Sequence, residues 1–417
     1  MLSAAHSLLG LACFLLLAVA LSRRRQAIRP RAVLAGVALQ AALTLLLLRV
    51  PAIAAGLLWL SGGVAVLQAA TDEGARFMFG YLAGGPQPFA TSGAGSDFIV
   101  AFRVLPLILV VSAISAVLFH LRVLPWLIGK MARGLQKSLG LSGPLGFGAA
   151  ASVFLGIIEG PLFVRPYLAA MPAAELFALM TCGMATVAGT VMVLYASIVE
   201  PVLPGALASI LVASLISVPA ALTVAHLMDP AEHREADDAL SLPVETKSWI
   251  EALMDGISEG TRVVIDVAAT IVVLFALVSL LNAGLALLPA AGGAPVTLQR
   301  GVGWLLTPLV WLMGMPWSDA VWCAERMGTK TVLNEFVAYM ELAAADGGPI
   351  SARSREILVF AMCGFANLGS MGILAGGLGS IVPSRRAEIA ALAGRALVAG
   401  TLATMMTGAM VGLLGGL

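Results

Sequence analysis

The feature that most constrains this chain is a series of long apolar runs with almost no charged residues. Residues 176–199, 207–227 and 263–288 are three of these runs. A helix needs about 20 residues to cross the hydrocarbon core of a bilayer, and each run is long enough. Only helices and closed barrels satisfy their backbone groups in lipid, and the runs lack the alternating pattern of barrel strands. The sequence therefore predicts an all-α integral membrane protein.

The overall composition supports the same class. Of the 417 residues, 60% are hydrophobic and 11% are charged, whereas soluble proteins contain about 25% charged residues. The formal net charge of +1 argues against a nucleic-acid-binding protein. The four cysteines form no CxxC motif and no cluster with histidine, so neither a disulfide framework nor a metal centre is expected.

About eight segments are predicted to span the membrane. They are residues 8–21, 32–48, 98–121, 176–199, 207–227, 263–288, 357–381 and 390–414. Arginines between positions 23 and 31 follow the first span, so the positive-inside rule places this loop in the cytoplasm. Residues 50–85 and 122–137 contain charged residues and are predicted to form interfacial helices. Four further polar residues are interpreted as interfacial or helix-end groups: Asp72, His120, Glu200 and Asp266.

Two further stretches, residues 142–171 and 316–342, are apolar enough to enter a membrane but are interrupted by charged residues. Neither has the roughly 20 uninterrupted apolar residues that a span requires. Each has the length of two half-spanning arms joined by a tip. Irregular backbone at such depth is tolerated only against protein or a water-filled cavity. Both stretches are therefore predicted to be re-entrant hairpins.

An internal repeat links the two hairpins. Residues 182–187 (Cys-Gly-Met-Ala-Thr-Val) follow the first hairpin, and residues 363–368 (Cys-Gly-Phe-Ala-Asn-Leu) follow the second. A chance match is an alternative because Gly and Ala are common in this chain, but a hairpin precedes both copies. The predicted spans between the hairpins are odd in number, so the repeats are inverted, as in secondary transporters.

This arrangement divides the chain into four regions. They are the N-terminal scaffold and interfacial helices (1–138), the first hairpin with a broken helix and the following span (139–228), a cytoplasmic linker with a long scaffold helix and an external loop (229–315), and the second hairpin with a broken helix and the last span (316–417). Residues 185–190 and 367–372 are predicted to break their helices at the midplane of the membrane. Carbonyls freed there can ligate a cation; the alternative is small-residue helix packing.

Glu159 and Glu335 are the strongest candidates for a functional site. Each lies at or near a hairpin tip, where an ionisable group costs at least roughly 2.5 kcal/mol and is a functional hypothesis by default. A carboxylate suits a hydroxyl-rich substrate because it can accept two hydrogen bonds from a diol. The structural alternative is an ion pair, Glu159 with Arg165 or Glu335 with Lys330. Asn367, whose amide is costly in lipid, is a further candidate.

At these residues the chain resembles the concentrative nucleoside transporters. The matching stretches are residues 156–168 (GIIEGPLFVRPYL), 328–339 (GTKTVLNEFVAY) and 363–367 (CGFAN), with shorter matches at 74–80, 385–386 and 395–397. The resemblance runs nearly from end to end. It implies eight transmembrane helices, interfacial helices, two re-entrant hairpins and a homotrimer in the lipid bilayer of a bacterial cytoplasmic (inner) membrane. It also implies import of nucleosides with a sodium or proton gradient.

The resemblance also implies roles for individual residues. The residues expected at the ribose are Glu335, its neighbour Asn334, Asn367 and Ser370, with Phe365 lining the pocket. The residues expected at the nucleobase are Glu159, Ile157 and Ile158. The residues expected near the cation, between the first hairpin tip and the first helix break, are Ser152, Leu155, Thr186 and Val187.

Two positions depart from the family pattern. The family usually has Gln-Thr or Gln-Ser where this chain has Ile157-Ile158, so base recognition is expected to be altered while ribose recognition is intact. Sodium-coupled members usually carry Asn where this chain has Ser152, and a hydroxyl is a poorer ligand for a hard cation than an amide carbonyl. This difference slightly favours protons, with Glu159 or Glu335 as the proton carrier.

The main interpretation is therefore a cation-coupled importer of nucleosides that needs no cofactor. The nearest alternative is a symporter of the same fold for a modified nucleoside or another small polar metabolite. A non-transporting membrane gate or scaffold protein is a further alternative. An enzyme is not expected, because the sequence has no HExxH or GxSxG motif and no paired aspartates within spans.

Overall fold

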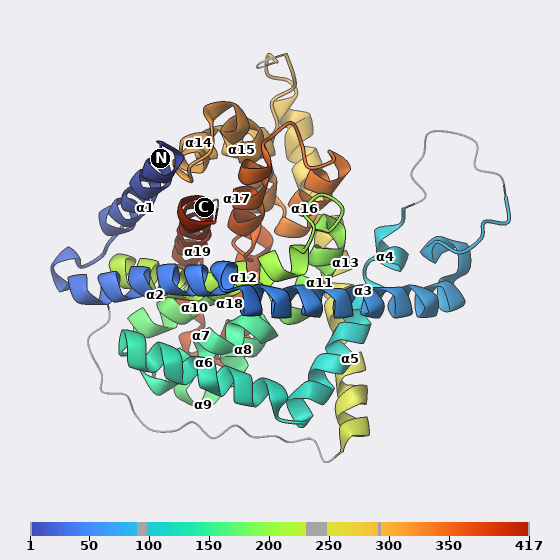
Figure 1. Ribbon diagram of the computed structural model, residues 1–417, viewed down its shortest axis with the longest axis horizontal. Helices are drawn as coiled ribbons and strands as arrows, with labels where there is room; N and C mark the ends of the chain where they lie inside the picture. The colour runs from blue at the N-terminus through green and yellow to red at the C-terminus, as the bar shows by residue number, and fades with distance from the viewer. Residues whose placement is uncertain (1, 90–97, 231–247, 291–292, 416–417) are drawn as a thin grey trace.

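The computed structural model describes residues 2–89, 98–230, 248–290 and 293–415, and within these ranges every regular element is a helix (Figure 1). The predicted all-α membrane fold is confirmed. The N-terminal region contains α1 (Leu2–Ala20), η1 (Arg25–Ala27), α2 (Pro30–Arg49), α3 (Pro51–Phe79), η2 (Gly80–Ala83), α4 (Val100–Arg103), α5 (Pro106–His120) and α6 (Val123–Leu139). Proline at the first position begins α2, α3 and α5, where its missing N–H has no helical partner to lose.

The rest of the chain contains two hairpins, each followed by a helix in two pieces. The first half has α7 (Gly143–Leu155), α8 (Glu159–Leu162), α9 (Arg165–Leu168), α10 (Ala173–Ala185), α11 (Gly189–Val199) and α12 (Ala206–Met228). Two helices connect the halves, α13 (Trp249–Leu285) and α14 (Leu298–Leu312). The second half has α15 (Trp317–Val332), α16 (Glu335–Ala344), α17 (Ala352–Met362), α18 (Leu368–Ile381), η3 (Pro383–Arg385) and α19 (Arg386–Leu414). We call α7 to α9 the first hairpin and α15 with α16 the second hairpin.

Six of the predicted spans coincide with helices, or pairs of helices in line, that are long and apolar enough to cross a membrane. They are residues 30–49, 100–120, 173–199, 206–228, 249–285 and 383–414. The remaining two predicted spans fall on α1 and on α17 with α18, which are shorter.

Arginines from three segments meet at one end of the helical bundle, the end that the sequence analysis assigned to the cytoplasm. The backbone N–H of Arg23 and the guanidinium of Arg395 both donate to the carbonyl oxygen of Met228, at 3.0 and 2.9 Å. The guanidinium of Arg385 donates to the carbonyl oxygen of Leu168 at 2.8 Å. The loop after α1, the end of α12, the base of the first hairpin and the start of α19 therefore meet at this end.

The base of the second hairpin lies at the opposite end. Asp319, in the first turn of α15, accepts a hydrogen bond from the Ser351 hydroxyl at 3.1 Å. Arg353, at the start of α17, donates to the carbonyl oxygen of Gly412 near the end of α19. The two hairpins thus enter the bundle from opposite ends, as inverted repeats require.

The connecting region contains more helix than the sequence analysis expected. The charged segment interpreted as a linker up to residue 259 is already helical from Trp249, because the Ser248 hydroxyl caps α13 by accepting from the Glu251 N–H at 3.1 Å. The predicted external loop contains α14, which the Thr297 hydroxyl caps. Residues 231–247 of the predicted linker lie outside the described residues.

Two helix breaks are present, the first at the predicted stretch and the second a few residues before its predicted stretch, and they contact each other. The first break separates α10 from α11 at residues 186–188, and the second separates α17 from α18 at residues 363–367. The Phe365 N–H donates to the Thr186 carbonyl oxygen at 3.3 Å. Gly364 allows this approach, because a Cβ there would lie 3.0 Å from the backbone of Ala185. The second break lies before the stretch predicted for it, because the Asn367 side chain already caps α18.

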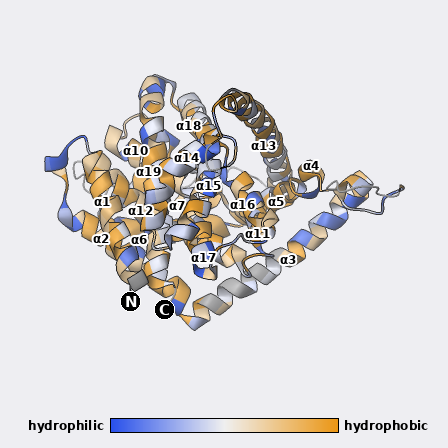
Figure 2. Cartoon of the chain, turned by 90° about the horizontal axis from the view of Figure 1, so that it is seen from above, coloured by the Kyte–Doolittle hydropathy of each residue, from blue (hydrophilic) through white to orange (hydrophobic). Residues whose placement is uncertain are grey.

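Two long helices lie at the edge of the bundle. Figures 1 and 2 show α3 running away from the main body of helices. Large apolar side chains on it are exposed, among them Trp59, Val66 and Phe77. The 37-residue α13 packs on α5 and likewise exposes apolar side chains, including Val272 and Leu280. Figure 2 shows hydrophobic residues over most of the bundle, as expected for a surface that faces lipid or another subunit.

Candidate functional site

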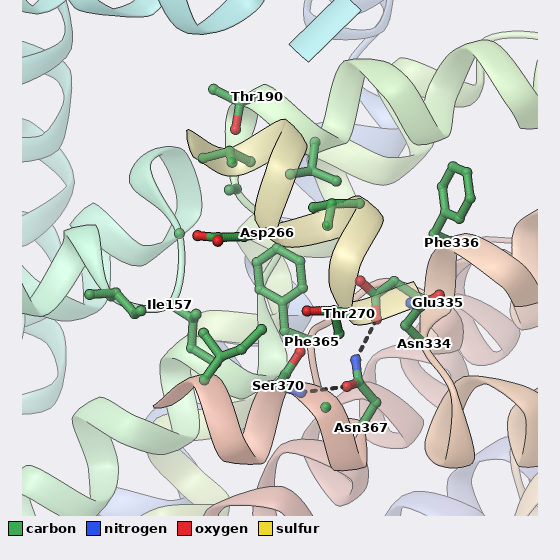
Figure 3. Close-up of a pocket in the computed structure, with 18 of the residues that line it drawn as sticks. Ile157, Thr190, Asp266, Thr270, Asn334, Glu335, Phe336, Phe365, Asn367 and Ser370 are labelled. Atoms are coloured by element: carbon green, nitrogen blue, oxygen red, sulfur yellow. Dashed lines mark hydrogen bonds between the residues drawn. The ribbon is translucent and has the colours of Figure 1, made fainter. Parts of the chain in front are cut away.

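A cavity of about 200 Å³ lies where the two hairpin tips, the two helix breaks and α13 come together (Figure 3). The structure brings all eight residues predicted at the substrate to its wall. They are Ile157, Ile158, Glu159, Asn334, Glu335, Phe365, Asn367 and Ser370. Among the residues that line it, three are acidic and none is Lys, Arg or His. The cavity therefore presents negative charge and hydrogen-bond acceptors.

The tip of the second hairpin holds Glu335 in a fixed position. Asn334 caps α16 by accepting from the Val337 N–H at 3.0 Å, so Glu335 is the first residue of the helix and is only 2% exposed. One carboxylate oxygen accepts from the Tyr195 hydroxyl at 2.6 Å, and the other accepts from the Asn367 amide at 2.9 Å. Each oxygen thus has one oriented donor and retains lone pairs for a further donor.

Asn367 has two functions at the second helix break. Its side-chain oxygen accepts from the Ser370 N–H at 2.7 Å and caps α18, while its amide nitrogen donates to Glu335. Figure 3 shows both bonds and places Phe365 beside them. The chemistry that predicted Asn367 as a site residue also explains why α18 begins there.

The first hairpin tip is built differently. Gly156 has a φ of +101°, and a Cβ at this position would lie 2.6 Å from a carboxylate oxygen of Glu159. Ile157 packs against Gly183 of α10, where a Cβ would lie 3.1 Å from the Ile157 side chain. Ile158 packs against Gly377 of α18 in the same way, at 2.4 Å. Both isoleucines therefore line the cavity and also fasten the tip to neighbouring helices.

The ion pairs considered as structural alternatives for the two glutamates are not formed at ion-pair distance. Among the described residues, neither Glu159 nor Glu335 forms an ion pair with Arg165 or Lys330. Lys330 is fully buried, and its ammonium donates to the carbonyl oxygen of Ala361 at 3.1 Å and to the Thr404 hydroxyl at 3.3 Å. It therefore meets the carbonyl end of α17, where a helix carries partial negative charge.

Three of the four residues predicted near a cation lie together behind the cavity. The Thr186 hydroxyl lies 3.1 Å from the carbonyl oxygen of Ser152, and the Val187 N–H donates to the Ser214 hydroxyl at 3.3 Å. The Ser152 hydroxyl donates to Gly148 within α7, which leaves its oxygen as an acceptor. Leu155, at the end of α7, lines the cavity instead. Hydroxyl and carbonyl oxygens of this kind suit a hard cation.

Two polar residues of the cavity were not predicted. Tyr195, on α11, was not singled out, because its partner Glu335 lies far away in the sequence. Asp266 was interpreted as an interfacial or helix-end group, but it lies in the middle of α13 and lines the cavity. Its position within an apolar run was the signal that could have identified it.

Three family descriptions match the chain along most of its length. Residues 9–82 match "Na+ dependent nucleoside transporter N-terminus", residues 101–202 match "Nucleoside recognition", and residues 209–412 match "Na+ dependent nucleoside transporter C-terminus".

Similar proteins occur in bacteria and animals. Nucleoside permease NupC of Helicobacter pylori is 35% identical over all of this chain and 99% of its own length. The putative nucleoside permease NupX of Escherichia coli is 34% identical, over 99% of each chain. Human solute carrier family 28 member 3 is 33% identical over 97% of this chain and 59% of its own length.

Solved structures of a transporter named CNTnw have the same fold. An inward-facing, substrate-bound structure is 37% identical with a TM-score of 0.89, and each chain is covered completely. An outward-facing structure of a CNTnw variant gives a TM-score of 0.88 at 36% identity, over 100% of this chain and 98% of the other. The similar scores show the fold without selecting one conformation. The chain is thus a multi-pass membrane protein that belongs to the concentrative nucleoside transporter family, a family of transporters and not of enzymes.

Proposed function

We propose that this protein imports nucleosides across the cytoplasmic membrane by cation-coupled alternating access, with the cavity as its substrate site. The observation that carries the proposal is the environment of Glu335. Its carboxylate is buried at the meeting point of the two repeats and held by donors from α11 and from the second helix break. Secondary transporters place their substrates at such a point.

The Glu335 end of the cavity suits a ribose. The two hydroxyls of a ribose can both donate to one carboxylate, and a charge-assisted hydrogen bond contributes roughly 1.5–3 kcal/mol. Asn367 and Ser370 add an amide and a hydroxyl within reach of the same region. The absence of basic side chains from the cavity lining argues against phosphorylated substrates, whose charge the three carboxylates would repel.

The other end of the cavity suits a nucleobase. Glu159 supplies a carboxylate there, while Ile157 and Ile158 supply apolar surface. Phe365 lies between the two ends in Figure 3, where its ring can pack against a base. The proposed orientation therefore puts the ribose toward the second hairpin and the base toward the first.

We assign the coupling cation to the region between α7 and the first helix break. The oxygens of Ser152, Leu155, Thr186 and Val187 are its expected ligands if it is sodium. If it is a proton, Glu159 or Glu335 carries it. The serine at position 152 favours the proton slightly, since its hydroxyl is a weaker sodium ligand than an amide carbonyl.

A homotrimer is part of the proposal. The exposed apolar side chains of α3 and α13 support it, because these helices lie at the edge of the bundle and are not covered within one subunit. The hairpins and broken helices would then move against this outer scaffold during transport.

Uptake of radiolabelled uridine and adenosine into proteoliposomes tests the function. Import should require an inward gradient of either sodium or protons, at fixed membrane potential. A proton-coupled protein should respond to outside acidification without sodium and lose uptake when a protonophore is added. A sodium-coupled one should need sodium at constant pH. Absence of uptake of every nucleoside under either gradient, in well-folded protein, would contradict the proposal.

A further inference from the structure

Asp266 is an acidic side chain in the cavity that neither hairpin nor helix break supplies. It lies midway along α13 and belongs to the cavity wall, as does Thr270 one turn later. Figure 3 shows its carboxylate directed from α13 toward the side where the first hairpin tip and Ile157 lie. In the part of the chain that the structure describes, it has no hydrogen-bond donor and no ion-pair partner. Its acceptor capacity is therefore free for a substrate.

The surroundings of Asp266 define what it can recognise. At this end of the cavity Ile157 and Ile158 provide no polar atoms, and Glu159 is a second group that, when ionised, only accepts hydrogen bonds. A substrate group that donates hydrogen bonds would be favoured here. A carbonyl oxygen placed against the same carboxylate would be repelled and would lose its own hydrogen bonds on entering the cavity.

We propose that Asp266 determines base selectivity by accepting a hydrogen bond from an exocyclic amino group, so that the site prefers amino-bearing nucleosides. This inference rests on the proposed function, because it requires a nucleoside with its ribose at Glu335. In that orientation the base extends past Phe365 toward the first hairpin, which is the side that Asp266 faces. The polar contact that Ile157 and Ile158 lack is then supplied by the long helix instead.

Two pairs of substrates probe this contact. Uridine has a carbonyl where cytidine has the amino group, and its adjacent ring nitrogen carries a proton; inosine differs from adenosine in the same way. The wild-type protein should favour the amino member of each pair by roughly threefold to tenfold, a reduced effect because Asp266 is an exposed residue. Uptake and competitive binding to the purified protein both measure the ratio.

Two variants test the residue. Asp266→Asn keeps one acceptor and adds a donor, so the preference should shrink or turn toward the carbonyl members. Asp266→Leu removes both carboxylate oxygens and adds no donor, so it should bring each uptake ratio close to one. Asp255→Asn is the matched control: it makes the same change on the same helix at an exposed position outside the cavity lining, and its ratios should equal those of the wild type.

The outcomes separate this inference from the proposed function. If the wild-type protein takes up no nucleoside, the proposed function fails. If it takes up nucleosides but both Asp266 variants keep the wild-type ratios, the assignment of Asp266 is overturned. An equal loss for all four nucleosides, together with altered dependence on the cation gradient, would also overturn it, since that pattern assigns Asp266 to coupling.

Discussion

The two hairpins are related by the internal repeat, yet their tips are held in different ways. In the second hairpin, polar side chains fix the tip: Asn334 caps α16, and Glu335 is bound on both oxygens. In the first hairpin, Gly156 makes the turn, and Ile157 and Ile158 pack on neighbouring helices. One tip is therefore positioned by directional bonds and the other by apolar contact. The tip of the second hairpin can orient a ribose, whereas the tip of the first hairpin leaves the choice of base to fewer polar groups.

The two helix breaks differ in a similar way. In the second repeat, the Lys330 ammonium meets the carbonyl end of α17 through Ala361. In the first repeat, the Thr186 hydroxyl lies 2.9 Å from the Cys182 carbonyl oxygen near the end of α10. The second repeat thus has a positive charge of its own at the helix end. The first has only a neutral donor, which agrees with our placing the coupling cation there.

The largest effect is expected from replacing the Glu335 carboxylate. Glu335→Gln exchanges one acceptor oxygen for an NH2 group, which faces the Tyr195 hydroxyl or the Asn367 amide donor. Ribonucleoside binding should weaken by about tenfold or more, since a hydrogen bond to a charged group contributes roughly 1.5–3 kcal/mol. Uptake kinetics with ribose and deoxyribose substrates measure this, and deoxyribose substrates should lose less. Wild-type uptake by the folded variant would remove Glu335 from the site.

A second change tests whether the bonds around Glu335 position it. Tyr195→Phe removes the donor to one oxygen, and affinity should fall roughly threefold to tenfold for ribonucleosides. Dideoxynucleosides should be affected less. Tyr339→Phe is the control, because Tyr339 is equally buried and packs on Tyr195 but donates to the Val359 carbonyl oxygen. Equal losses in both variants would show a packing effect instead.

A third change concerns the cation. Ser152→Asn supplies the amide carbonyl that the first repeat lacks. Any stimulation of uptake by sodium should become stronger, and the sodium concentration that gives half-maximal stimulation should fall by a few-fold. The measurement is uridine uptake against sodium concentration at constant pH and potential. Ser152→Ala should have the opposite effect on a sodium-coupled protein. Identical sodium curves for all three proteins would place the cation elsewhere.

The smallest effect is expected at the first hairpin tip. The double variant Ile157→Gln with Ile158→Thr adds polar atoms to the cavity wall, each able to change the free energy of base binding by roughly 1 kcal/mol. Competition among uridine, cytidine, adenosine and guanosine should become more selective by a few-fold. Sensitivity to loss of the ribose hydroxyls should stay unchanged. An unaltered profile in an active variant would mean that the two isoleucines only pack against Gly183 and Gly377.

The sequence predicted most of the fold because each element had a local signal. Apolar length identified the spans, and interrupting charges identified the hairpins. It missed α14 and the early start of α13, each of which begins at the hydroxyl of a single capping residue. It also placed the second break late, because the small residues after Asn367 can be either loop or helix.

The site was predicted where its chemistry was visible in one segment. Glu335 and Asn367 each lie in a distinctive motif and are costly to bury without a partner. Tyr195 could not be found in this way, since its role depends on a carboxylate 140 positions away that only the folded chain brings within 2.6 Å. Asp266 had a local signal, its position within an apolar run. The span was predicted to begin at residue 263, which put Asp266 near a helix end, whereas α13 begins at Trp249 and Asp266 lines the cavity from its middle.

The double role of Asn367 has a consequence for how the transporter can diverge. A change at this position disturbs the start of α18 and the environment of Glu335 together, so selection acts at once on folding and on the proposed ribose site. Asp266, across the cavity, caps no helix and binds no neighbour in the described part of the chain. New substrate ranges should therefore evolve by substitutions at the first-hairpin end of the cavity, where the base is proposed to bind. The Glu335 end should stay nearly unchanged in descendants.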